Sequence, residues 1–203
     1  RCRVPDLRVA LVPVGRMDAA ELEDAAARVS KVIRAAVDLR EPLPHPKSAE
    51  DAARGQFRAP AILAVARGAL PGLAVRKSVG APAAGTPAPA PARAAAVLVT
   101  DLDLYSPATD WVLSETDAAR GLAVVSVRRL REAFYRRKAD PAKQRARLAK
   151  EPLRAIGRVR GLSDCGDPAC AMAATRSLAD VDRKGERYCA PCWKRLSTGA
   201  MRI

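Results

Sequence analysis

The sequence has little histidine, few aromatic residues and no long apolar run. Its 203 residues include 1 histidine, and aromatic residues make up 3% of the chain. A single histidine cannot build a multi-histidine metal site, and neither Ser126 nor Ser163 has an evident histidine to activate it as a nucleophile. No apolar run approaches the roughly 18 residues that span a bilayer. We therefore expect no serine-type hydrolase and no membrane span, and we expect His45, which lies between two prolines, at the surface.

Cysteine is also scarce, but its spacing is informative. Of 5 cysteines, four form the tight pairs Cys165-x4-Cys170 and Cys189-x2-Cys192, and Cys2 stands alone. This usage favours a reducing compartment with a metal site over a disulfide framework, so we expect the cytoplasm. Four thiolates with no open position are typical of a structural tetrahedral zinc site. The alternative is a cluster of four buried neutral thiols.

The charge of the chain is strongly positive. The formal net charge is +14 and the sequence pI is about 10.3. Clustered basic residues between Arg136 and Lys150 would suit a nucleic-acid partner, because such residues neutralise phosphates. However, only 8 of the 36 basic residues are lysine, a bias that also arises from genome composition. Nucleic-acid binding is therefore the weaker alternative.

A long helix is predicted just before the cysteines. Asp140 is a good N-cap residue, and Pro141 suits the first helical position. Gly161 can adopt the left-handed conformation that ends a helix, so we expect the helix to run to about residue 160. Pro152 lies inside this segment and lacks a backbone donor, so a kink or break is expected near residues 148–152.

The register of this helix against the cysteines resembles the archaemetzincin family of zinc metallopeptidases. In that family H-E-x-x-H-x-x-G-x-x-H is followed at once by Cys, then Cys-x-Met and Cys-x-x-Cys. Here Cys165, Cys170-Ala171-Met172 and Cys189-Ala190-Pro191-Cys192 hold the cysteine positions. Further likeness lies in the segments 11–15, 54–57, 99–104, 126–130 and 177–184, so the resemblance covers most of the chain.

The resemblance places the catalytic positions on residues that have changed. Arg154 and Arg158 occupy the first two ligand positions, Ala155 the general base position and Asp164 the third ligand position. An arginine has no acceptor to offer a metal. We therefore predict no catalytic zinc, a non-catalytic pseudo-metallopeptidase, and one structural zinc on the four cysteines. Met172 resembles the family's Met-turn, which forms the floor below the metal.

An arginine can supply positive charge where a metal once sat. We favour a bidentate pair between Arg154 or Arg158 and Asp164 over arginines that extend into solvent. Glu151 lies one helical turn earlier, where it could join this pair. It is not the missing base, because its register differs by four residues.

The fold that the resemblance and the patterns imply is α/β and metzincin-like. We expect one domain over residues 1–203, with a twisted mixed sheet, a backing helix, an active-site-type helix and a C-terminal zinc subdomain over 162–203. Strands are predicted at 8–14, 96–101, 110–114 and 122–127, and the backing helix begins after Asp18. The segment 51–67 is predicted as a weaker helix broken near Pro60. The Ala- and Pro-rich segment 80–94 is predicted to be a mobile loop.

The predicted strand 110–114 corresponds, by the resemblance, to the edge strand with which a metzincin binds its substrate. Trp111, Val112 and Leu113 are therefore candidates for pairing with an extended peptide, which needs no zinc. The alternative for Trp111 is an ordinary core position. The expected function is a catalytically inactive zinc-binding protein that holds a peptide or protein partner in the former cleft. A residual or unconventional metallopeptidase and a basic nucleic-acid-binding module are the alternatives.

Overall fold

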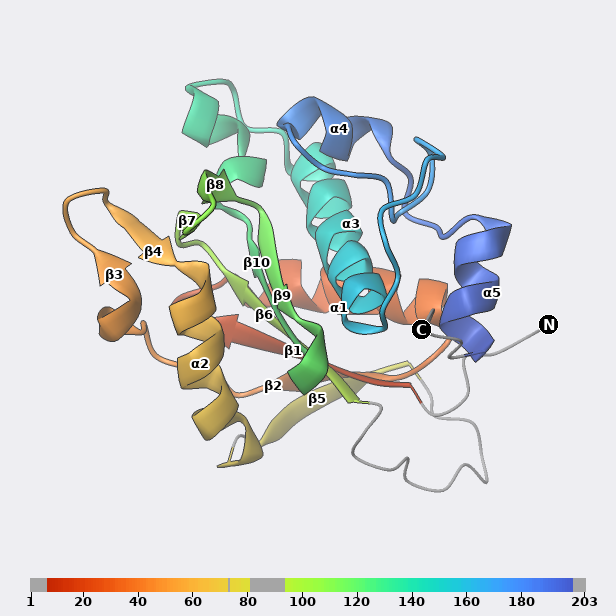
Figure 1. Cartoon of the computed structure of the whole chain (residues 1–203), viewed down its shortest axis with the longest axis horizontal. Coiled ribbons are helices and arrows are strands. Elements are labelled where there is room, and N and C mark those ends of the chain that lie inside the picture. Colours follow the sequence, from red (N-terminus) through yellow and green to blue (C-terminus); the bar gives the residue numbers. More distant parts are fainter. Residues whose placement is uncertain (1–6, 73, 81–93, 199–203) are drawn as a thin grey trace.

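The computed structural model describes residues 7–72, 74–80 and 94–198, and Figure 1 shows their arrangement. Two sheets and five α-helices make up the described part of the chain. The strands are β1 (Arg8–Val14), β2 (Val37–Arg40), β3 (Glu50–Asp51), β4 (Gln56–Arg58), β5 (Val75–Val79), β6 (Ala94–Thr100), β7 (Leu104–Ser106), β8 (Thr109–Val112), β9 (Ser114–Asp117) and β10 (Leu122–Ser126). The α-helices are α1 (Ala19–Ile33), α2 (Ala59–Ala69), α3 (Pro141–Val159), α4 (Leu178–Arg183) and α5 (Ala190–Thr198).

The main sheet has six strands in the order β5-β2-β1-β6-β10-β9. The four central strands are parallel, while β5 and β9 pair antiparallel at the two edges. The central strands β1, β6 and β10 are nearly continuous runs of Val, Leu and Ala, as expected for parallel strands that are covered on both faces. A smaller sheet, β3-β4-β7-β8, lies beside α2.

Side chains alternate between the two faces of the main sheet, so each face has its own core. On one face Leu11, Val97 and Val125 pack against α1 and α3. On the other face Val12 and Leu98 pack against α2. The result is three layers, with α1 and α3 on one side of the sheet and α2 on the other (Figure 1).

The predicted α/β fold and the helix boundaries next to the site are confirmed. Asp18 caps α1 by accepting a hydrogen bond from the Glu21 N–H at 2.9 Å. Asp140 caps α3 in the same way. Gly161 adopts φ +80°, and the Leu162 N–H donates back to the Gly157 carbonyl at 2.9 Å, which ends α3. Such a helix end aims the following segment back across the helix.

The predicted break at Pro152 does not occur, because α3 is one helix from Pro141 to Val159. Its inner face, including Leu148, Leu153 and Ile156, is fully buried against the main sheet. Burying three such side chains contributes roughly 1.5–3 kcal/mol each, which exceeds the roughly 3 kcal/mol cost of an internal proline.

Two other predicted elements are correct only in part. Residues 50–58 form the hairpin β3–β4 instead of helix, and Pro60 lies in the first turn of α2, where its missing N–H costs nothing. The predicted strand 110–114 divides into β8, an edge of the small sheet, and β9, an edge of the main sheet. Of the predicted loop 80–94, residues 81–93 lie outside the described residues.

Candidate metal centre and motif helix

The structure brings the four C-terminal cysteines together. The Sγ atoms of Cys165, Cys170, Cys189 and Cys192 all lie within 4.8 Å of one another. The Cys165 and Cys189 sulfurs are 3.7 Å apart. A tetrahedral site with Zn–S bonds of about 2.3 Å requires sulfurs about 3.8 Å apart. The four residues therefore fit a closed zinc site, and they are the one group of three or more ligand-type side chains that could hold a metal among the described residues.

Backbone contacts position these sulfurs. The Cys165 N–H donates to the Met172 carbonyl at 2.9 Å, which pairs the two arms of the first knuckle. The N–H groups of Met172 and Cys189 point at the Cys170 sulfur at 3.4 and 3.3 Å. These two N–H groups lower the pKa of the Cys170 thiol and so partly offset burial, which raises it.

The thiols of the cluster differ in acidity. Burial raises the pKa of Cys170 and of Cys192 above the ordinary value. Burial also opposes ionisation of Cys189, but the Cys192 N–H and the neighbouring thiols lower its pKa overall. A metal cation must displace the remaining protons, so binding is coupled to proton release.

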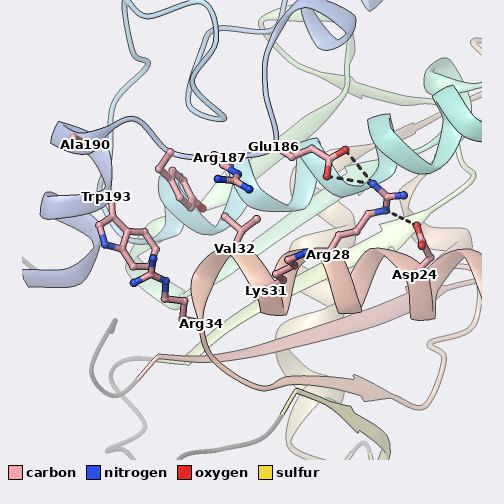
Figure 2. A pocket seen from close by; sticks show the side chains of 10 residues that line it. Asp24, Arg28, Lys31, Val32, Arg34, Glu186, Arg187, Ala190 and Trp193 are labelled. Carbon is pink, nitrogen blue, oxygen red and sulfur yellow. Dashed lines mark hydrogen bonds and ion pairs between the residues drawn. The ribbon is translucent and has the colours of Figure 1, made fainter. Parts of the chain in front are cut away.

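A groove of about 790 Å³ lies between α1 and the segment that carries the second cysteine pair (Figure 2). At one end of the groove, Arg28 forms ion pairs with Asp24 and Glu186. At the other end, the Arg34 guanidinium lies over the Trp193 ring, 5.2 Å from its centroid. The groove is lined by four cations, Arg28, Lys31, Arg34 and Arg187, and by the two carboxylates Asp24 and Glu186.

The residues at the motif positions lie on α3 and just after it. The Arg154 Nη2 donates to the Asp164 Oδ1 at 2.6 Å, and the Arg158 Nη1 lies 4.0 Å from the same oxygen. The Arg154 side chain is only 15% exposed. The predicted arginine contact with Asp164 is therefore present, but it uses one carboxylate oxygen and not a bidentate pair. The Arg154 Nε is buried without a hydrogen-bond partner.

These motif residues do not fit a catalytic zinc ion. Two guanidinium groups have no lone pair to donate to a metal, and Asp164 alone supplies one carboxylate. Ala155, at the general base position, is fully buried in the core that α3 shares with α1. No reaction step through a metal can be derived from this set of side chains.

Glu151 does not use the option of joining the Asp164 pair. It forms an ion pair with Lys184 at 2.6 Å, and both side chains are 0% exposed. The Lys184 ammonium also donates to Thr175 at 3.0 Å, while the Glu151 Oε2 has no hydrogen-bond partner. Burial lowers the pKa of Lys184. The pair joins the middle of α3 to the segment between the two cysteine pairs, a contact that the sequence pattern did not reveal.

Arg147 makes a second buried connection from α3 to α4. Its guanidinium donates to both oxygens of Asp182 at 2.6 and 2.7 Å, to Glu132 at 2.7 Å and to the Leu130 carbonyl at 2.8 Å. Lys150 donates to two α4 carbonyls and is also buried. Two members of the predicted basic cluster are thus used inside the protein, which weakens the argument for a nucleic-acid surface.

Met172 packs against α3, the helix that carries the motif positions 154, 155 and 158, and is fully buried. A Cβ atom added at Gly157 would come within 2.2 Å of the Met172 sulfur. Gly157 is therefore the position on α3 that lets the loop between Cys170 and Ala173 approach the helix.

The candidate edge residues do not belong to the open edge strand of the main sheet. Trp111 and Val112 belong to β8, and the Arg129 guanidinium lies over the Trp111 ring at 5.1 Å. Leu113 is 5% exposed, and its carbonyl accepts a hydrogen bond from Ser126. The open edge of the main sheet is β9, which begins at Ser114, so the predicted strand 110–114 overlaps it at one residue only.

Comparisons with known proteins identify the family that this chain resembles. The family model described as Peptidase family M54 matches residues 93–198. The archaemetzincin of Methanocaldococcus jannaschii is 36% identical over 98 residues, which are 48% of this chain and 55% of that protein. The archaemetzincin of Pyrococcus furiosus is 33% identical over 98 residues, 48% of this chain and 51% of that protein. The matched part thus spans about half the length of these curated relatives.

Solved structures match nearly the whole fold. The zinc-dependent peptidase from Methanocorpusculum labreanum superposes with a TM-score of 0.77 at 26% identity, covering 93% of this chain and 99% of that one. The archaemetzincin from Methanopyrus kandleri superposes with a TM-score of 0.72 at 26% identity. The match covers 95% of this chain and 94% of that one. The predicted resemblance to archaemetzincin is confirmed.

One prediction is overturned by these matches. The changed motif residues led to the prediction that the chain is not an enzyme. A match to a family of peptidases, with archaemetzincins among the relatives and a zinc-dependent peptidase among the similar structures, contradicts it. The residues at the four motif positions do not by themselves decide whether the chain has peptidase activity. Among the described helices, none combines the length and apolar character that crossing a membrane requires.

Proposed function

The chain belongs to peptidase family M54, and from this premise we propose that it binds an extended peptide or protein segment along the open edge of β9, beside the motif helix α3. The observation that carries the proposal is the antiparallel strand β9 at the edge of an otherwise parallel sheet. An extended segment can add to such an edge through main-chain hydrogen bonds.

The register of β9 defines which of its groups face the peptide. The Ser126 N–H donates to the Leu113 carbonyl, so these two residues form a hydrogen-bonded pair of the ladder. Hydrogen-bonded pairs alternate along an antiparallel ladder, so Glu115 also bonds to β10. The N–H and C=O groups of Ser114 and Thr116 therefore point to the open edge.

The helix α3, which packs against β9, carries a cation that could engage a bound segment. The half-exposed Arg158 guanidinium is only 4.0 Å from Asp164, which is already engaged by Arg154. A carboxylate on a bound segment would compete well for such a cation. This favours acidic side chains in the part of the ligand that lies nearest the C-terminal end of α3.

We also propose that the zinc ion of the cysteine cluster has a structural role. The cluster has four ligands and leaves no position for a substrate or a water molecule, which is the arrangement of structural sites. It joins residues 165–173 to the first turn of α5, so the metal would cross-link segments that have only short helices of their own.

The test is binding of a positional library of fluorescein-labelled decapeptides, followed by fluorescence anisotropy. Thr116→Pro removes one donor from the open edge without removing a ladder bond, so affinity should fall about tenfold with little change in stability. Glu115→Pro is the matched variant, because it removes a ladder donor and should lower the melting temperature. Equal peptide affinity for Thr116→Pro and the unchanged protein would contradict binding at β9.

Hydrolysis of the bound segment is the second candidate, and family membership favours it. The same library, incubated with zinc-loaded protein and analysed by mass spectrometry, measures it directly. Cleavage that chelators abolish and that Thr116→Pro slows would assign peptidase activity to this edge. Binding without cleavage would leave recognition as the function. Retention of nucleic acid in a salt-dependent manner would instead support the basic-module alternative.

A further inference from the structure

The order of strands creates a topological switch point between β1 and β6. From β1 the chain passes through α1 to β2 on one side of β1, and later returns to β6 on its other side. The connecting helices α1 and α2 cover opposite faces of the sheet (Figure 1). In open sheets with parallel central strands, ligands bind outside the carboxyl ends of the strands at such a point.

A hollow of about 710 Å³ lies at this point. It is bounded by Gly15 after β1, by the proline-rich loop after β2, by Asp101 and Leu102 after β6, and by Arg128 after β10. Its volume is in the range of small-molecule sites, and the loop side chains Pro42, Leu43 and Pro44 give it apolar walls.

The polar groups around the hollow favour a negatively charged ligand. Arg16 and Arg128 line it as cations, while Asp101 is its one carboxylate. Asp101 is already engaged, since the Arg131 Nε donates to it at 3.0 Å. Arg128 lies 3.7 Å from the other oxygen of Asp101, and Arg16 forms no ion pair with the described residues.

His45 is placed in the hollow by a glycine. Gly15 has φ +75°, and a Cβ there would lie 1.9 Å from the His45 Nε2. The absence of a side chain at Gly15 thus lets the imidazole lie against the backbone at the end of β1. The ring also lies near Phe57 in an edge arrangement, with centroids 6.4 Å apart. The imidazole lines the hollow and can donate or accept a hydrogen bond there.

We propose that this hollow binds a small organic anion, with its oxyanion between Arg16, Arg128 and His45 and its apolar body against the proline-rich loop. Carboxylate and phosphate oxyanions share this chemistry, because a guanidinium binds both with the same donor fork. The site is separate from β9 and from the cysteine cluster, so it would operate whether or not the peptide proposal holds.

The experiment uses the fact that the chain contains 1 histidine. In protein free of a histidine tag, the two carbon-bound imidazole protons of His45 give a single pair of NMR signals. These signals are followed during titration with phenyl phosphate, benzoate and inorganic phosphate. Saturable shifts with phenyl phosphate or benzoate, and weaker binding of inorganic phosphate, are expected because the last probe lacks an apolar body. The stronger of the two organic probes identifies the oxyanion.

Variants locate the binding. Arg16→Gln and Arg128→Gln should each weaken the organic anion about tenfold, the loss expected for one charge-assisted hydrogen bond. Arg67→Gln is the matched control, because Arg67 is an exposed cation on α2 and does not line the hollow. His45 signals that do not move, equal binding of inorganic phosphate, or equal weakening by Arg67→Gln would each overturn the proposal.

Discussion

Replacing Lys184 with methionine tests the buried connection between α3 and the cysteine-bearing segment. Methionine has a similar length and can fill the same space, but it leaves the Glu151 carboxylate without its ion-pair partner. Both side chains are 0% exposed, and the Glu151 Oε2 already lacks a hydrogen bond. Removing one partner of a buried pair typically costs 3–5 kcal/mol, so we expect a loss of about 4 kcal/mol in the free energy of unfolding. For a chain of this size the melting temperature should fall by roughly 10 °C.

The assay is urea unfolding of the zinc-loaded protein, followed by far-ultraviolet circular dichroism. Lys194→Met is the matched control, because Lys194 is exposed on α5, and it should change stability by less than about 0.5 kcal/mol. The double variant Glu151→Leu with Lys184→Met should recover most of the loss, since replacing both members of a buried pair by apolar groups is often neutral. A loss below about 1 kcal/mol for Lys184→Met, or no recovery in the double variant, would refute the reasoning.

Two further predictions concern the same C-terminal segment. The purified protein should contain one zinc ion per chain by elemental analysis, and Cys189→Ser should lower both zinc content and melting temperature, because metal binding contributes folding free energy; full zinc content in this variant would exclude Cys189 as a ligand. Hydrogen bonds from Arg147 hold the pKa of Asp182 below its ordinary value of 3.8, so the stability from this pair is present above pH 3.8 and is lost as the pH falls through the lowered pKa. Asp182→Asn should therefore destabilise the protein at neutral pH and flatten the acid side of its stability curve, measured by thermal melts between about pH 2.5 and pH 7; an unchanged acid slope would contradict this assignment.

Local sequence signals determined the helix ends and the cysteine cluster. Asp140 and Gly161 fixed the limits of α3, because capping and left-handed backbone depend on residues near in sequence. The spacing of the four cysteines was sufficient to predict that they meet, because two short knuckles leave few other arrangements. The resemblance of this cysteine pattern to archaemetzincin also predicts the α/β fold from the sequence.

Tertiary structure alone decided which charges are buried and which strand forms an edge. Glu151 could face Arg154 or Lys184 equally well by sequence, and only the path of the chain through α4 brings Lys184 to it. The segment 110–114 has a single apolar pattern, but it does not form a single strand. Residues before Leu113 pair in the small sheet as β8, and residues after it pair in the main sheet as β9. The hollow at His45 likewise requires β1, β2, β6 and β10 to end together. Each of these features depends on contacts between residues far apart in the chain, which periodicity and spacing do not encode.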